Sequence, residues 1–159
     1  MEYLVNSSEM KRCDYNIINK IGMPSMVLVE RAALATMGEL YDGIFDLGRI
    51  LVVCGKGNNG ADGFALARLL YLKDMDVDIL FIDKKDGCTA ETAHEIRIAK
   101  NYGIRILKNV DFEDYTTIVD AFLGVGLSRD VEGKYAEIIN QINNSKALVL
   151  SVDVPSGIS

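Results

Sequence analysis

Apolar and polar positions along the chain change their pattern near residue 43. Before this point, two segments carry apolar side chains at helical spacing, which predicts helices over residues 7–20 and 24–41. Gly22 separates the two segments, and Pro24 is placed to start the second helix. The chain therefore begins with a helical pair before any strand is expected.

After residue 43, short continuous apolar runs alternate with amphipathic segments. The apolar runs predict strands over residues 50–54, 77–82, 116–122 and 147–152, with a further short apolar segment at 103–107. Helices are expected over 61–73, 89–102 and 135–142. Apolar strands that alternate with helices indicate a parallel sheet covered on both faces, so the fold class is a three-layer α/β/α sandwich.

Three loops that follow predicted strands are rich in Gly, Asp, Asn and Ser. They lie at 54–62, at 123–130 and at 153–157. In parallel sheets these loops gather at the carboxyl edge, where such folds bind their ligands. One polar loop would be ordinary turn chemistry, but three at one edge predict a composite pocket.

The first loop, C-G-K-G-N-N-G-A-D-G (54–63), joins a buried strand to a helix N-terminus, an arrangement that suits phosphate. Its glycines satisfy G-x-G-x-x-G, and Asp83 follows where a dinucleotide's ribose would be bound, as in dehydrogenases. A purely structural turn, with glycines at positive φ and Asp62 as a helix cap, is equally open. In such a turn Asn58 and Asn59 would tolerate left-handed geometry. Pyrophosphate binding does not explain the two asparagines and Asp62, whose side-chain oxygens suit a cation or a polyhydroxylated ligand.

The other two loops each offer one carboxylate. Asp120 ends its strand just before two glycines, and it suits either a turn cap or a ligand contact. Arg129 could donate to a phosphate. Asp153 precedes Pro155-Ser156-Gly157, so it is either a bystander in a turn or a general acid/base at the sheet edge.

Composition narrows the class of protein. The chain of 159 residues suits one domain over 1–159, with 49% apolar residues. Its net charge of −6 argues against a nucleic-acid surface. Three cysteines without a C-x-x-C pair argue against disulfides and zinc, and no apolar run suits a membrane span or a signal peptide. We therefore expect a cytoplasmic protein.

Three segments carry a family resemblance: V-V-C-G-K-G-N-N-G-A-D-G-F-A-L-A-R (52–68), V-D-A-F-L-G-V-G-L-S-R (119–129) and V-D-V-P-S-G-I (152–158). With M-K-R-C-D (10–14) and G-M-P-S-M-V-L-V-E (22–30), they resemble the YjeF N-terminal domain family, the NAD(P)H-hydrate epimerases. Such enzymes interconvert the R and S forms of hydrated NADH and NADPH, which carry a hydroxyl on C6 of the nicotinamide ring. The resemblance implies a Rossmann-like fold and commonly a homodimer.

The resemblance also implies the site. A potassium ion would be held by Asn59, Asp120 and Ser156, and Asp153 is the expected acid/base. The substrate would contact these residues: Asn58, Asn59, Gly60, Ala61, Asp62, Gly124, Val125, Gly126, Leu127, Ser128, Arg129, Asp130 and Asp153.

Two departures from the family pattern leave alternatives open. Ala61 stands where the family usually has a second glycine, so its methyl group could tighten the turn around the ligand. The chain stops at Ser159, where family members continue with further strands and a Lys, so we expect those strands to be lacking.

An NAD(P)-dependent oxidoreductase and a non-catalytic nucleotide-binding or scaffold module remain alternatives. Fusion or pairing with an NAD(P)H-hydrate dehydratase is a possible partnership.

Overall fold

The structure is a computed structural model that describes residues 7–124 and 131–158. The chain opens with helix α1 (Ser7–Asn16), a π-helical turn η1 (Ile17–Ile21) and helix α2 (Ser25–Asp42). The π turn is not expected from the sequence. It arises where Gly22 adopts a φ of 84° and its N–H bonds the carbonyl of Ile17, five residues back. The predicted break at Gly22 and the start after Pro24 are confirmed.

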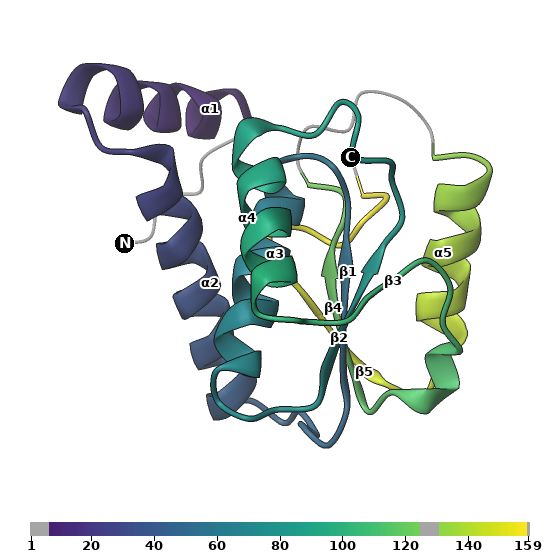
Figure 1. The fold of residues 1–159 in the computed structure, drawn as a ribbon. Helices are drawn as coiled ribbons and strands as arrows, with labels where there is room; N and C mark the ends of the chain where they lie inside the picture. Colours follow the sequence, from purple (N-terminus) through teal and green to yellow (C-terminus); the bar gives the residue numbers. More distant parts are fainter. Residues whose placement is uncertain (1–6, 125–130, 159) are drawn as a thin grey trace.

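Five parallel strands form the sheet in the order β3-β2-β1-β4-β5 (Figure 1). Their bounds are β1 Ile50–Cys54, β2 Val77–Phe81, β3 Ile106–Leu107, β4 Thr117–Ala121 and β5 Leu148–Ser151. Every residue of β1, β2 and β4 is buried, which explains their continuous apolar runs. The order switches direction at β1, since β2 and β4 flank it, and ligands bind at such switch points.

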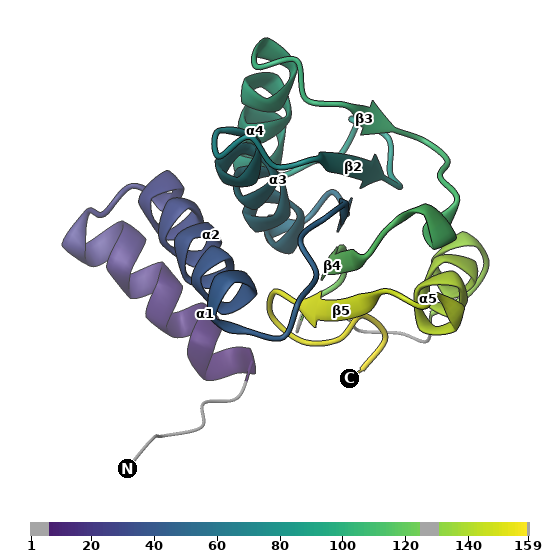
Figure 2. The ribbon, with the colours of Figure 1, turned by 90° about the horizontal axis from the view of Figure 1, so that it is seen from below.

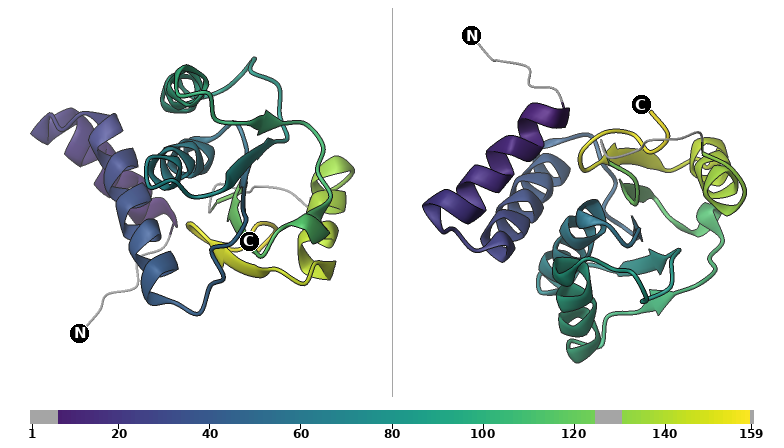
Figure 3. Two further views of the ribbon diagram at one scale, coloured as in Figure 1. Left: turned by 60° about the horizontal axis from the view of Figure 1, so that its bottom comes forward. Right: turned by 90° about the horizontal axis from the view of Figure 1, so that it is seen from above.

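Helices cover both faces of the sheet (Figures 2 and 3). Helices α2, α3 (Asn58–Tyr71) and α4 (Ala90–Asn101) lie on one face, where α2 contacts α3 and α3 contacts α4. Helix α5 (Lys134–Asn144) and the 3-10 turn η2 (Phe112–Asp114) lie on the other. Alternate strand residues feed two separate cores, with Val52 in the first and Val53 in the second. The predicted three-layer α/β/α sandwich is confirmed.

A charged network closes the amino edge of the sheet. The Asp78 carboxylate is only 1% exposed, and it accepts hydrogen bonds from Arg105 and, at 2.9 Å, from the Tyr115 hydroxyl. Arg49 lies 3.7 Å from Asp78, with its guanidinium 5.0 Å from the centre of the Tyr115 ring. Arg105 also binds Asp76 at 2.6 Å. This edge thus pairs each buried charge with an opposite one.

The three cysteines are free thiols, as their spacing predicts: Cys13 is exposed, Cys54 is buried and Cys88 is half-buried. No helix within residues 7–124 and 131–158 is long and apolar enough to cross a membrane.

Candidate functional site at the carboxyl edge

The turn between β1 and α3 is tight because its glycines allow backbone segments to touch. A Cβ on Gly60 would lie 1.9 Å from the carbonyl oxygen of Gly55, and one on Gly55 would lie 2.3 Å from that of Phe122. Neither glycine has a positive φ, so the expected role of left-handed geometry is wrong. Close approach is the reason for these glycines, and it draws the ends of β1 and β4 together at the site.

Helix α3 begins at Asn58, three residues earlier than predicted, so both asparagines lie in its first turn. Gly57 is the N-cap and no side chain caps the helix, so its first N–H groups lack the usual side-chain acceptor. Asp62 is inside the helix, and the expectation that it caps the helix is wrong. Ala61 is fully buried in the core, so its methyl group packs inward.

Three polar side chains from distant segments meet beside α3. The Ser156 hydroxyl donates to the Asp120 carboxylate at 2.5 Å, and the Ser156 N–H donates to it at 2.7 Å. Leu123 joins them, because its N–H donates to the Ser156 hydroxyl at 3.0 Å and its carbonyl accepts from the Asn59 amide at 3.0 Å. The structure therefore brings together Asn59, Asp120 and Ser156, which were predicted to hold a cation.

The donor set at this point consists of oxygen atoms, which suit a hard cation. The Asn59 side-chain oxygen is buried and is left without a hydrogen-bond partner within the described ranges. The Asp120 carboxylate, the Ser156 hydroxyl and the Leu123 carbonyl supply further oxygens nearby. In the described part of the chain, no three His, Cys, Asp or Glu side chains gather as they do in transition-metal sites.

Asp153 borders the same cluster through Gly124. A Cβ on Gly124 would lie 2.7 Å from a carboxylate oxygen of Asp153 and 3.5 Å from the Cβ of Asn59. The loops after β1, β4 and β5 therefore converge, as their positions at one sheet edge predict. Asp153 itself is exposed, so its carboxylate is accessible from solvent.

Asp62 has an unusual environment for a carboxyl group. Burial, followed by the negative charges of Asp153, Asp14 and Glu95, raises the pKa of Asp62 from 3.8 to about 7. Burial also raises the pKa of Asp120, although hydrogen bonds from Ser156 oppose the rise. A carboxyl that holds its proton to neutral pH can act as a general acid.

Sequence reasoning missed two of these acids. Asp14 lies on α1 and Glu95 on α4, far from the glycine-rich loops. Glu95 is only 2% exposed and pairs with Arg68 at 3.6 Å. The signal that could have identified Glu95 is its burial within a helix. The sequence does not reveal burial of a single polar position.

Asp83 does not have the free carboxylate that a dehydrogenase would use for the ribose. One of its oxygens accepts the N–H of Lys56 at 2.9 Å, and the other accepts the hydroxyl of Tyr135. Two cations near the loops are also engaged elsewhere, because Arg68 binds Glu30 and Lys134 donates to the carbonyl of Ile82 at 3.0 Å. The oxidoreductase alternative therefore loses its supporting acid.

Part of the predicted substrate loop lies outside the described residues. This applies to Val125, Gly126, Leu127, Ser128, Arg129 and Asp130. Their contacts with a substrate remain predictions.

Comparison with known families and proteins gives a consistent result. The family described as "YjeF-related protein N-terminus" matches residues 25–159. A protein of Oenococcus oeni named NAD(P)H-hydrate epimerase is 47% identical over 98% of this chain and 75% of its own length. Proteins of the same name from Weissella koreensis and Levilactobacillus brevis are 47% and 44% identical, over 98% and 100% of this chain and 71% and 74% of their own lengths.

Among solved structures, the fold resembles the crystal structure of yeast ynu0. The TM-score is 0.84, and the match covers 98% of this chain and 72% of that chain. The sequence identity is 20%, so this likeness bears on the fold alone.

Proposed function

Because the chain belongs to the family of YjeF-related protein N-termini, we propose that it is an NAD(P)H-hydrate epimerase. The enzyme would interconvert the R and S forms of hydrated NADH and NADPH. The observation that carries the proposal is the meeting of Asn59, Asp120, Ser156 and Asp153 beside the open N-terminus of α3. This cluster unites the three loops that would have to act on one ligand.

The start of α3 supports binding of the substrate's phosphates. Its first-turn N–H groups and the positive end of the helix dipole favour an anion, and Gly57 leaves this end uncapped. Helix α4 supports the turn, since the Thr92 hydroxyl donates to the Gly57 carbonyl at 2.8 Å. A fixed seat for the phosphates would position the nicotinamide ring near Asp153.

Epimerisation at C6 needs a proton donor and a proton acceptor. The lone pair of the ring nitrogen expels the hydroxyl as water once an acid protonates it, and water returning to the other face of the iminium gives the epimer. We assign Asp153 as the acid/base that contacts the hydroxyl. The charge of Asp62 interacts with that of Asp153, and Asp62 holds its proton to about pH 7. Asp62 would supply the proton that Asp153 transfers to the substrate.

Potassium is the cation we propose for the oxygen cluster. Asn59, Asp120 and Ser156 would hold it, and its charge would orient the substrate and offset the Asp120 carboxylate. Potassium is expected to raise the melting temperature of the wild type more than lithium at equal ionic strength. In Asn59→Ala this difference should disappear, whereas equal responses of the wild type to both ions would contradict the assignment.

A homodimer, pairing or fusion with an NAD(P)H-hydrate dehydratase, and a cytoplasmic location are further proposals from the family resemblance. Several large apolar side chains of the first two helices are exposed, including Met10, Tyr15, Val27 and Leu34, and they offer a surface for a second copy.

The function is tested by an epimerisation assay. Purified R-hydrate of NADPH is supplied with an excess of a dehydratase specific for the S form, so that its consumption reports epimerisation. We expect the chain to raise the rate well above that of spontaneous epimerisation. A rate equal to the spontaneous one, from folded protein with potassium present, would exclude the proposed activity.

A further inference from the structure

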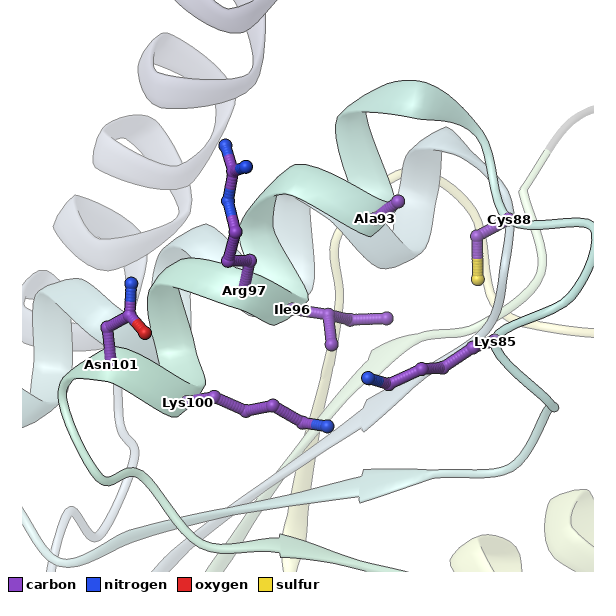
Figure 4. A pocket seen from close by; sticks show the side chains of 7 residues that line it. All are labelled: Lys85, Cys88, Ala93, Ile96, Arg97, Lys100 and Asn101. Atoms are coloured by element: carbon purple, nitrogen blue, oxygen red, sulfur yellow. The ribbon is translucent and has the colours of Figure 1, made fainter.

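A pocket lies beside α4, and none of the residues of the carboxyl-edge cluster lines it. Its volume is about 350 Å³, and it lies between α4 and the loop that joins β2 to α4 (Figure 4). Small-molecule sites usually have volumes of about 300–1,000 Å³, so this pocket is large enough for a small ligand. The lining residues are Lys85, Cys88, Ala93, Ile96, Arg97, Lys100 and Asn101.

Two ammonium groups converge on this pocket. Figure 4 shows the side chains of Lys85 and Lys100 extending toward each other, with Ile96 alongside them. Arg97 points away, and its guanidinium contacts the ring of His94 at 3.0 Å. Binding of an anion in this pocket would therefore depend on the two lysines.

The two lysines lack direct ion-pair partners in the described part of the chain, although the charges of Asp83 and Asp86 act on Cys88 in the same pocket. No ion pair joins Lys85 or Lys100 to a carboxylate within residues 7–124 and 131–158. The contact with Lys85, some loss of hydration and the charges of Lys85 and Lys108 lower the pKa of Lys100. Two positive charges that lie close together repel each other, and an anionic ligand between them would remove this repulsion.

We propose that this pocket binds a phosphomonoester, with Lys85 and Lys100 holding the phosphate and Ala93 and Ile96 packing against its organic part. A phosphate group carries close to two negative charges at neutral pH, so one group can neutralise both ammonium ions. A carboxylate would neutralise only one of them. The apolar side chain of Ile96 and the aliphatic stems of the lysines suit a group larger than inorganic phosphate.

The phosphate could come from two sources. One is the 2′-phosphate of hydrated NADPH, because the β2–α4 loop starts at the carboxyl edge. Gly87 lies in this loop, and the ammonium nitrogen of Lys56, in the β1–α3 turn, is 4.0 Å from the Cβ position of Gly87. The other is a separate phosphorylated small molecule. Only the first source depends on the proposed epimerase function.

Direct binding tests the site without any activity. Phenyl phosphate is titrated calorimetrically into the wild type, into the double variant Lys85→Ala/Lys100→Ala, and into Lys73→Ala as a control. Lys73 is an exposed lysine beyond the end of α3, at the opposite edge of the sheet. We expect the double variant to bind at least about tenfold more weakly, since two charge-assisted contacts are lost.

The Lys73→Ala control and a further double variant, Lys85→Arg/Lys100→Arg, should bind within about threefold of the wild type, because both retain the two charges. All variants should keep the wild-type melting temperature, since both side chains are exposed. Absence of saturable binding, or equal binding by the wild type and the folded double variant, would overturn the proposal.

Kinetics then identifies the source of the phosphate. If the double variant raises KM for hydrated NADPH at least about tenfold but leaves KM for hydrated NADH unchanged, the occupant is the substrate's 2′-phosphate. If both KM values stay unchanged while phenyl phosphate binding is lost, the occupant is a separate phosphomonoester. A chain without epimerase activity still gives a clear result in the calorimetric experiment.

Discussion

Asp78 and Asp120 are both buried carboxylates on strands of one parallel sheet, yet their surroundings differ. Asp78, at the amino edge, is 1% exposed and has Arg105, Arg49 and the Tyr115 hydroxyl around it. Asp120, toward the carboxyl edge, is 5% exposed and accepts hydrogen bonds from Ser156, with no cation paired to it among the described residues.

The contrast extends to the neighbours of each acid. At the amino edge, the aspartates raise the pKa of Arg105, so the charges there stabilise one another. At the carboxyl edge, burial raises the pKa of Asp120, and burial together with neighbouring acids raises the pKa of Asp62. Neutralised charges indicate a structural role, whereas Asp62 and Asp120, which form no ion pair within the described residues, indicate a site that a ligand completes.

The largest expected effect comes from removing the acid/base at the carboxyl edge. Asp153→Asn should lower kcat by about 10²–10⁴-fold, because the amide cannot exchange a proton with the substrate. The free energy of unfolding should change by less than about 1 kcal/mol, since Asp153 is exposed. The coupled epimerisation assay and urea unfolding measure both quantities.

Asp74→Asn serves as the control, because Asp74 is an exposed aspartate at the opposite edge of the sheet. Its kcat should equal that of the wild type. Wild-type kcat in folded Asp153→Asn would show that another group transfers the proton.

At the amino edge, the same kind of substitution should affect stability instead. Asp78→Asn leaves Arg105 and Arg49 facing a neutral amide, so the free energy of unfolding should fall by about 2–3 kcal/mol. Both arginines are partly exposed, which keeps the loss below that of a fully buried pair. The urea midpoint measures the loss, and kcat of the folded fraction should stay the same.

Asp76→Asn is the matched control at this edge. Asp76 is 50% exposed, so its removal should cost less than about 1 kcal/mol. Equal losses for the two variants would mean that burial of Asp78 does not decide the effect.

The smallest expected effect is a change in the free energy of unfolding with pH. Removing the Asp62 carboxyl at the carboxyl edge should stabilise the fold, whereas removing the Asp78 carboxylate at the amino edge should destabilise it. The pKa of Asp62 is raised from 3.8 to about 7, so the folded chain holds this proton more tightly than the unfolded chain. The stabilisation due to this proton is complete below about pH 4 and is lost as the pH rises through about 7. Asp62→Asn should therefore match the wild type near pH 4 and be more stable at pH 8. The full shift corresponds to about 4 kcal/mol, and we expect about 2 kcal/mol because Asp62 is partly exposed to solvent.

The activity of the wild type gives a second measurement of the same group. If Asp62 supplies the proton, kcat should fall as the pH rises above about 7, and Asp62→Asn should lose both this fall and most of the activity. A variant that is no more stable at pH 8 than at pH 4, relative to the wild type, would show that Asp62 is ionised without penalty.

Much of the fold follows from local pattern. The apolar run at 50–54 and the break at Gly22 each predicted an element or a boundary that the structure confirms. The helix start at Asn58 was missed, because the glycines and asparagines of 57–60 resemble a loop by propensity. The position of Gly60 against the Gly55 carbonyl, rather than residue preference, fixes that boundary.

The candidate site was predicted in part for the same reason. The carboxyl ends of parallel strands must share one edge, so the three polar loops could be expected together before any coordinates. The choice of Asn59, Asp120 and Ser156 within these loops came from the family resemblance, and the structure brings the three side chains together. Asp14 and Glu95 could not, since no local pattern places them near Asp62.

The sequence by itself determined the elements, the parallel sheet and the edge at which polar loops meet. Hydrophobic periodicity is a local property, and strands that alternate with helices run parallel. Only the tertiary structure decided which acids are neutralised. Asp78 is paired with Arg105 and Arg49, while Asp62 lies among other acids. The state of a carboxyl depends on the charges and solvent around it, and these come from segments far apart in the chain.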